Sequence, residues 1–304
     1  MVSTYPRRAR ALRFFRRFGA LVALAGLLGY IAISLLAAEI LTRSNNRRTS
    51  SRPSDVGPEV KVWSTRTADG LTLRGWYCPT SDHRRLIVLV HGMGGSRDEM
   101  AHIGHDLHRE GYDVLLFDTR GHGVSDPSRL FMGRRERGDL RAVLDWAMLH
   151  GYTPDRVGWL GYSMGASTLL MEAAQNGNIQ VAVLDSPFGN LPELLDAELT
   201  RHSHLPAWFN PGILVAARLA FGVRTDDLIP LRSALRWGAR PLLLIHGEAD
   251  SIVPVRQARQ IARAIGPTCQ AVTLPGVQHV GAYNRDPSRY IAAVDRFFDR
   301  NLRP

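Results

Sequence analysis

The hydrophobic pattern of the chain opens with an apolar run that is longer than the core helix of a soluble domain requires. Between Phe18 and Ala38 no residue carries a charge. At a rise of ~1.5 Å per residue, a helix of this length covers roughly the ~30 Å hydrocarbon core of a bilayer. The run also exceeds a signal-peptide core, and Leu35 and Leu36 stand where a cleavage site needs small residues. The pattern predicts an uncleaved single transmembrane helix over residues 18–41.

Beyond residue 58, short apolar runs alternate with helical patterns. From Leu86–Val90 onward these runs are almost continuously apolar, which is typical of parallel strands buried on both faces. The two earlier runs have no helix between them and are expected to pair antiparallel. The alternation predicts an α/β fold with right-handed crossovers and a mostly parallel eight-stranded sheet flanked by helices. The expected strands are 60–65, 71–77, 86–90, 114–118, 157–160, 181–184, 242–245 and 271–274, and the expected helices are 97–110, 135–150, 164–175, 255–265 and 287–300.

The rest of the chain divides around these two features. Residues 1–17 form a basic N-terminal segment, and residues 42–58 are polar and rich in Asn, Ser, Pro and Gly, as expected of a linker. Residues 59–304 suit one α/β domain. Within it, residues 189–238 form an insertion with helical stretches. Because ligands of such sheets bind at the carboxyl ends of the strands, this insertion is expected to form a lid over the site.

The positive charge of the chain is concentrated near its N-terminus. Residues 1–52 hold ten arginines and one acid, Glu39, and so account for nearly all of the net charge of +10. This distribution indicates an anionic membrane surface and not nucleic acid as the partner. Six arginines precede the apolar run and four follow it. The positive-inside rule therefore favours a cytoplasmic N-terminus and an extracytoplasmic C-terminal domain.

A G-x-S-x-G pentapeptide, Gly161 to Gly165, stands between an expected strand and an expected helix. An abrupt strand-to-helix turn holds its serine in a strained conformation and leaves room only for small neighbours, which the two glycines provide. The pentapeptide alone is a weak signal, because glycine and serine are common residues. In this context it marks Ser163 as a candidate nucleophile.

A serine hydroxyl attacks a carbonyl poorly unless a base takes its proton and a third group orients that base. His279 lies in a loop directly after the last expected strand, and Asp250 lies directly after the seventh. Both positions fall at the carboxyl edge of the sheet, where Ser163 also lies. The order Ser, Asp, His fits a nucleophile-elbow enzyme. Asp185, at the end of the sixth strand, is the rival acid, and the spacing favours Asp250.

Such a site also needs two backbone N–H groups that bind the charge developing on the carbonyl oxygen. Met164 follows the candidate nucleophile and begins a helix, so its N–H is available. The second donor is expected from the loop after the third strand, most simply from Met93. His91 is expected to brace that loop.

These motifs resemble those of α/β-hydrolases, in the broad group of monoacylglycerol lipases, serine aminopeptidases and acyl-protein thioesterases. The matching stretches are 91–95, 118–125, 161–165, 184–188, 246–250, 252–254 and His279. The resemblance runs from residue 60 to the C-terminus, and it implies the α/β-hydrolase fold and serine-based hydrolysis. Glu136 and Asp139 echo the same group and are interpreted as structural. The long apolar run makes the chain similar to the membrane-anchored type.

The sequence therefore predicts a membrane-anchored serine hydrolase that cleaves a carboxylic ester or thioester through an acyl-enzyme, on a small or lipid-like acyl substrate. Two alternatives stay open. An aminopeptidase-like peptidase would need acids to grip a free amine, and a tethered binding protein would keep the fold without turnover. The acids available for the first alternative are Glu193, Asp196, Glu198, Asp226 and Asp227.

No cofactor and no metal are expected. His102, His105 and His108 are spaced by three, but Met100, Ile103 and Leu107 define the core-facing stripe of that helix, so the histidines are interpreted as a solvated face. The glycines of the loop after the third strand lack the pattern of a phosphate site. Cys78 and Cys269 are too few for a disulfide framework and are expected to be free thiols, with a single bridge as the alternative. Oligomeric state is left open.

Overall fold

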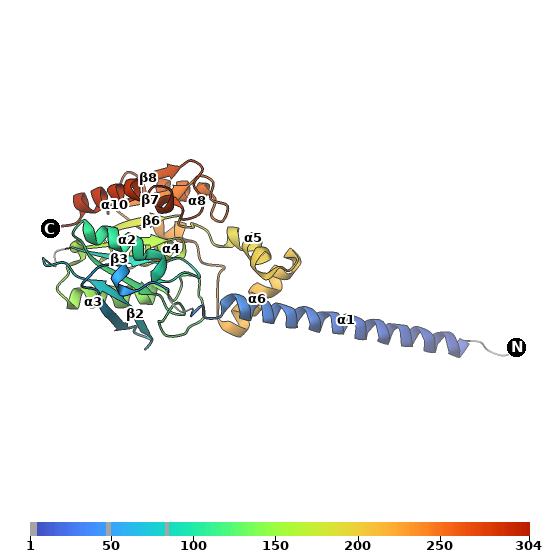
Figure 1. The fold of residues 1–304 in the computed structure, drawn as a ribbon. Helices are drawn as coiled ribbons and strands as arrows, with labels where there is room; N and C mark the ends of the chain where they lie inside the picture. Colours follow the sequence, from blue (N-terminus) through green and yellow to red (C-terminus); the bar gives the residue numbers. More distant parts are fainter. Residues whose placement is uncertain (1–4, 47–49, 83–84) are drawn as a thin grey trace. The chain divides into compact units, whose positions relative to one another are not determined.

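The computed structural model describes residues 5–46, 50–82 and 85–304. Residues 1–4 of the predicted basic segment and 47–49 of the predicted linker lie outside the described residues. The chain forms two compact units. One is the long helix α1 (Tyr5–Thr42) together with Asp196–Arg224, and the other comprises Arg43–Leu195 and Thr225–Pro304. Each unit is described by itself below, and Figure 1 labels many of their elements.

The larger unit is built on one eight-stranded sheet of order β1-β2-β4-β3-β5-β6-β7-β8. The two N-terminal strands pair antiparallel, as predicted, β2 also pairs antiparallel with β4, and every pairing among β3 to β8 is parallel. The α/β-hydrolase architecture expected from the sequence is thereby confirmed. The strands are β1 (Lys61–Arg66), β2 (Thr72–Cys78), β3 (Leu86–Val90), β4 (Asp113–Asp118), β5 (Val157–Tyr162), β6 (Val181–Asp185), β7 (Leu242–Gly247) and β8 (Cys269–Leu274).

Helices cover both faces of this sheet, which explains the continuously apolar strands. Successive residues of a strand point to opposite faces. In β3, Val88 therefore joins the core beneath α3 and α4, while Leu89 joins the core beneath α2 and α10. The helices of this unit are η1 (Pro53–Asp55), α2 (Arg97–Arg109), α3 (Arg137–Leu149), η2 (Pro154–Arg156), α4 (Met164–Ala173), α7 (Pro230–Ala234), α8 (Val255–Ile265), α9 (Ala282–Arg285) and α10 (Pro287–Asn301), with the start of α5 (Pro192–Ser203).

The sheet order separates the two cysteines. Cys78 ends β2 and Cys269 begins β8, six strand positions away. At ~4.8 Å per strand this is roughly 29 Å, several times the reach of a disulfide. Both residues are free thiols, and burial raises the pKa of each to about 11. The expectation of unpaired cysteines holds, and the alternative of a single bridge is wrong.

The smaller unit pairs α1 with helices of the insertion, η3 (Ala207–Phe209) and α6 (Asn210–Phe221). Within α1, the stretch Arg10–Thr42 contains an 18-residue window with a mean hydropathy of 2.3, and the stretch is long and apolar enough to cross a membrane. The side chain of Tyr30 stacks on the rings of Trp208 and Phe209, with centroids 5.6 and 5.0 Å apart. The apolar N-terminal helix and the insertion, which were predicted as separate segments, thus form one helical unit. The expected place of the insertion over the site stays a prediction.

Candidate active site

Ser163 occupies the turn between β5 and α4, with a backbone φ of 48°. Non-glycine residues rarely adopt this region, so the surrounding structure must hold the serine there. Its N–H donates to the carbonyl of Asp185 on the neighbouring strand (2.9 Å). A side chain at Gly165 would come within 2.5 Å of the Val90 and His91 carbonyls. The motif glycine therefore lets α4 start directly against the end of β3.

His279 lies between the other two predicted site residues. Its Nε2 is 2.8 Å from Ser163 Oγ, and its Nδ1 is 2.7 Å from Asp250 Oδ2. Asp250 Oδ1 accepts from the backbone N–H groups of Ile252 and Val253, at 2.9 and 2.8 Å. Because these bonds fix the carboxylate, Nδ1 carries the hydrogen that points at it. Nε2 is then the nitrogen free to accept the serine proton.

The Asp250 carboxylate is buried yet held ionised. Burial by itself raises its pKa, but hydrogen bonds from His246 and His279 outweigh burial and keep the pKa well below its usual value. His246 Nε2 lies 3.2 Å from Asp250 Oδ2 and 2.8 Å from the Val253 carbonyl. Sequence reasoning assigned His246 no role, although its position four residues before the acid could have suggested this contact.

Asp185, the rival acid, has a different place. It is fully buried, and burial raises its pKa to about 6. Its Oδ1 accepts from Ser186 Oγ (3.0 Å), and Ser186 Oγ in turn accepts from the N–H of Val280 (3.1 Å). Asp185 thus supports the loop that carries His279, and it is Asp250 that contacts the imidazole.

The two predicted N–H donors belong to the start of α4 and to the loop after β3. Met164 is the first residue of α4, where N–H groups have no acceptor within the helix. Met93 lies in a turn closed by the Gly95 N–H on the Gly92 carbonyl (3.3 Å), in which Gly94 adopts φ +75°. A side chain at Gly92 would reach within 3.4 Å of Ser163 Cβ, so this turn packs directly on the serine.

Two buried histidines brace that turn. His91 Nε2 accepts from the Thr119 N–H (3.1 Å), so Nδ1 carries the hydrogen and donates to the Gly92 carbonyl (2.7 Å). His122 Nε2 accepts from the Gly94 N–H at 3.2 Å. Burial lowers the pKa of His91 to about 4 and that of His122 to about 3. Both rings are therefore neutral near pH 7, which these acceptor roles require. The predicted bracing role of His91 agrees with these contacts.

Further contacts of this turn and of the neighbouring loop after β4 escaped sequence reasoning. The carboxylate of Glu99 accepts from the Gly92 N–H (3.2 Å), and partial burial of this group raises the pKa of Glu99. Asn45 donates from its side chain to the Gly94 carbonyl (2.7 Å) and from its backbone to the Gly121 carbonyl (2.6 Å). Asn46 Nδ2 donates to the Ser125 carbonyl at 2.8 Å. The residues just after α1 are thus bonded to the loops that frame the serine.

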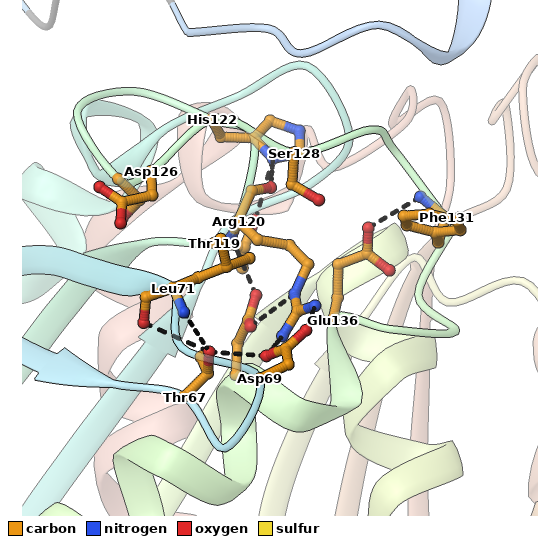
Figure 2. A network of polar contacts seen from close by, with 12 residues as sticks. Thr67, Asp69, Leu71, Thr119, Arg120, His122, Asp126, Ser128, Phe131 and Glu136 are labelled. Atoms are coloured by element: carbon orange, nitrogen blue, oxygen red, sulfur yellow. Dashed lines mark hydrogen bonds and ion pairs between the residues drawn. The ribbon is translucent and has the colours of Figure 1, made fainter. Parts of the chain in front are cut away.

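Arg120 organises a second polar network beneath these loops (Figure 2). Its guanidinium is buried between two carboxylates, with Nε 2.8 Å from Asp139 and Nη1 2.7 Å from Asp69. Burial raises the pKa of Asp139 to about 7, whereas the hydrogen bond from Arg120 lowers that of Asp69 to about 2. Glu136 accepts from the N–H groups of Phe131 and Gly133, both at 2.9 Å. These contacts agree with the structural interpretation of Glu136 and Asp139.

An eight-stranded, mostly parallel sheet with a serine on the strand-to-helix turn defines an α/β-hydrolase. A family profile described as "Serine aminopeptidase, S33" matches residues 81–236. The protein MT2364 of Mycobacterium tuberculosis is 32% identical over 284 residues, which cover 87% of this chain and 92% of that protein. The chain belongs to this family of serine hydrolases.

Two further relatives carry names that describe an activity. The esterase Pf2001 of Pyrococcus furiosus superposes with a TM-score of 0.71 at 26% identity, over 86% of this chain and 99% of the esterase. A probable lysophospholipase L2 of Haemophilus influenzae is 32% identical over 119 residues, covering 36% of this chain and 37% of that protein. With the family, these likenesses make the chain an esterase-like hydrolase.

Proposed function

We propose that this protein is a membrane-anchored serine hydrolase that cleaves carboxylic esters or thioesters through the triad of Ser163, His279 and Asp250. The observation that carries the proposal is the unbroken hydrogen-bonded chain from Ser163 Oγ through His279 to Asp250, at 2.8 and 2.7 Å. Nucleophile, base and orienting acid are at the separations that acyl transfer requires.

In the proposed mechanism, Ser163 Oγ attacks the carbonyl carbon while His279 Nε2 takes the hydroxyl proton. The Met93 and Met164 N–H groups bind the resulting oxyanion, and Asp250 stabilises the imidazolium. Collapse of this intermediate breaks the bond to the leaving alcohol or thiol, which receives the proton from Nε2. Water then attacks the acyl-enzyme, giving a proton to His279. The carboxylic acid departs and Ser163 regains its proton.

The membrane anchor is proposed from the length and apolarity of Arg10–Thr42 and from the arginines before the uncharged run. This run matches a bilayer core in length. The excess of arginines on its N-terminal side supports an extracytoplasmic hydrolase unit under the positive-inside rule. An anchored enzyme meets lipid esters at high local concentration. Together with the likeness to a probable lysophospholipase, this favours a lipid-like acyl substrate.

The family name also raises the aminopeptidase alternative, which requires acids free to bind a substrate ammonium group. Three of the acids that could do so are already paired: Glu193 with Arg256, Asp227 with Arg134, and Glu198 with Arg201. A paired carboxylate has less attraction left for a substrate amine. Ester or thioester cleavage is therefore the proposed activity.

A fluorophosphonate probe and two substrate sets test the proposal on the full-length protein in detergent. Wild type is expected to label at Ser163 and to hydrolyse nitrophenyl esters, while Ser163→Ala does neither. Preference for aminoacyl nitroanilides over esters would favour the peptidase. Absence of both labelling and turnover in a folded wild type would favour a non-catalytic binding protein.

A further inference from the structure

The insertion helix presents apolar side chains on both of its faces. Phe209, Ile213 and Ala217 are buried within the helical unit. The opposite side of α6 carries Val215 and Leu219, which are 55% and 79% exposed. These two residues define the outer stripe, and their spacing of four places them on one side of α6. A surface helix in water turns polar residues outward, so an apolar outer stripe indicates an apolar medium.

The inner face of the segment packs on α1 at the close range typical of helix pairs in membranes. A side chain at Gly212 would lie 2.5 Å from Ser34 Oγ and 2.5 Å from Tyr30 Oη. Ser34, Ala37 and Ala38 are buried on α1 and Tyr30 is partly buried, whereas residues 18–29 are exposed. Small residues facing small residues let two backbones approach where no hydrophobic effect drives association.

The position of this contact along α1 sets the depth of the insertion helix. Tyr30, which stacks on Trp208 and Phe209, precedes Ala38 at the end of the uncharged run by eight residues, or ~12 Å of helix. Gly212 contacts the same part of α1. If residues 18–38 lie in the bilayer, the start of α6 lies beside residues within it. A helix packed there has its free side against lipid.

We infer that η3–α6 is a second membrane-inserted element, embedded beside the C-terminal part of α1 with Val215 and Leu219 facing acyl chains. This inference rests on the proposed anchor and deepens the proposed function, because it assigns the insertion of this hydrolase to the lipid phase. The basic C-terminal end of the segment fits this arrangement, because the long side chains of Arg218 and Arg224 can reach the headgroups.

The experiment measures lipid contact residue by residue in the full-length protein, reconstituted in phosphatidylcholine vesicles. In a background with Cys78→Ala and Cys269→Ser, single cysteines at Val215→Cys and Leu219→Cys carry an environment-sensitive fluorophore. Leu149→Cys, also highly exposed but in the sheet unit, is the matched control. Leu24→Cys, in the middle of the uncharged run, reports the anchor itself. Fluorophosphonate labelling of Ser163 verifies the fold of each variant.

Labels at 215 and 219 are expected to be quenched by nitroxide-bearing acyl chains several-fold more than the label at 149, and several-fold less by aqueous iodide. If the label at 24 is quenched by lipid and those at 215 and 219 only by iodide, the inference is wrong and the anchor stands. Protection of 215 and 219 from both quenchers would show a protein-covered face, from a second copy or a packed lid, and would also overturn the inference. Iodide quenching at 24 would refute the anchor.

Discussion

The two units of this protein solve the burial of apolar side chains in opposite ways. The sheet unit packs them between strands and helices, and its buried histidines His91 and His122 hold the loops around Ser163 through hydrogen bonds. The helical unit leaves Trp208 and Leu219 exposed and holds together through small residues such as Ser34 and Gly212. The first unit should therefore be sensitive to the loss of single polar atoms, and the second to added volume.

The largest expected effect is on the serine. Ser163→Ala is expected to reduce ester turnover by up to ~10⁶-fold, because nucleophile and base act as one group. The reduction is measured as initial rates on nitrophenyl butyrate. Tm should stay equal or rise, because the substitution leaves the scaffold intact. Residual turnover within tenfold of wild type would contradict the nucleophile assignment.

The two strand-end acids provide the next test. Asp250→Asn is expected to lower kcat by ~10⁴-fold, because an amide can no longer fix the imidazole with its Nδ1 hydrogen toward the acid. Asp185→Asn keeps a similar shape and changes only the support through Ser186, so kcat should fall by no more than about tenfold. The measurement is kcat for both variants on one ester. The opposite ranking would make Asp185 the orienting acid.

The Arg120 network tests whether the sheet unit is sensitive to the loss of a buried polar group, and the free energy of unfolding is the quantity compared. Arg120→Met leaves Asp139 buried without its cation and is expected to cost about 3–5 kcal/mol of unfolding free energy. The cost appears as a lower Tm. Arg85→Met, which removes an ion pair with the exposed Asp299, is the control and should cost about 0–1 kcal/mol. Adding Asp139→Asn to Arg120→Met should recover part of the loss. Equal losses of stability in the two arginine variants would refute the distinction between the buried and the exposed ion pair.

The buried histidines predict how stability depends on pH. Their folded-state pKa values, about 4 for His91 and about 3 for His122, lie below the ordinary value of 6.5. The unfolded chain therefore binds more protons than the folded chain below pH 6.5. The stability that the neutral histidines contribute is complete above pH 6.5 and is lost as pH falls towards 4. For His91 the loss is about 3 kcal/mol. Asp139 and Asp185 act in the opposite direction. Because their folded-state pKa values are raised, they stabilise the folded protein as pH falls through part of this range.

The histidine contribution is isolated by comparing wild type with His91→Gln. Tm of wild type and variant is measured from pH 7 to pH 4.5. The variant is expected to be less stable at pH 7 and to lose less stability on acidification. A parallel decline in both proteins would mean that His91 is not the titrating group.

The smallest expected effect lies in the helical unit. Gly212→Leu adds volume where α6 meets α1. It is expected to weaken the packing of the two helices by about 1–3 kcal/mol of free energy. Tryptic cleavage at Arg218 in micelles should become a few-fold faster, while labelling of Ser163 stays within a factor of two. Gly26→Leu is the matched control, because a side chain there meets nothing within 4 Å. Equal cleavage rates in the two variants would argue against close packing at Gly212.

What the sequence could predict depended on regular spacing. The strands of the sheet followed from apolar runs. The positions of Ser163, Asp250 and His279 at strand ends followed from those strands, and the structure brings the three together. The contacts of Asn45 and Glu99 could not be predicted, because each joins a polar residue to a backbone atom in a turn whose shape no pattern encodes. The pairing of α6 with α1 could not be predicted either, because an apolar helix in the insertion is compatible with a lid and with a membrane contact.

The wide separation of β2 and β8 has a consequence for how the protein matures. With Cys78 and Cys269 held at distant strands, the native state contains no covalent cross-link that an oxidising enzyme must install. The hydrolase unit can therefore reach the same folded state in a reducing cytosol and in an oxidising periplasm or extracellular space. Reductant should leave its unfolding transition unchanged, and a recombinant host needs no disulfide machinery to produce it.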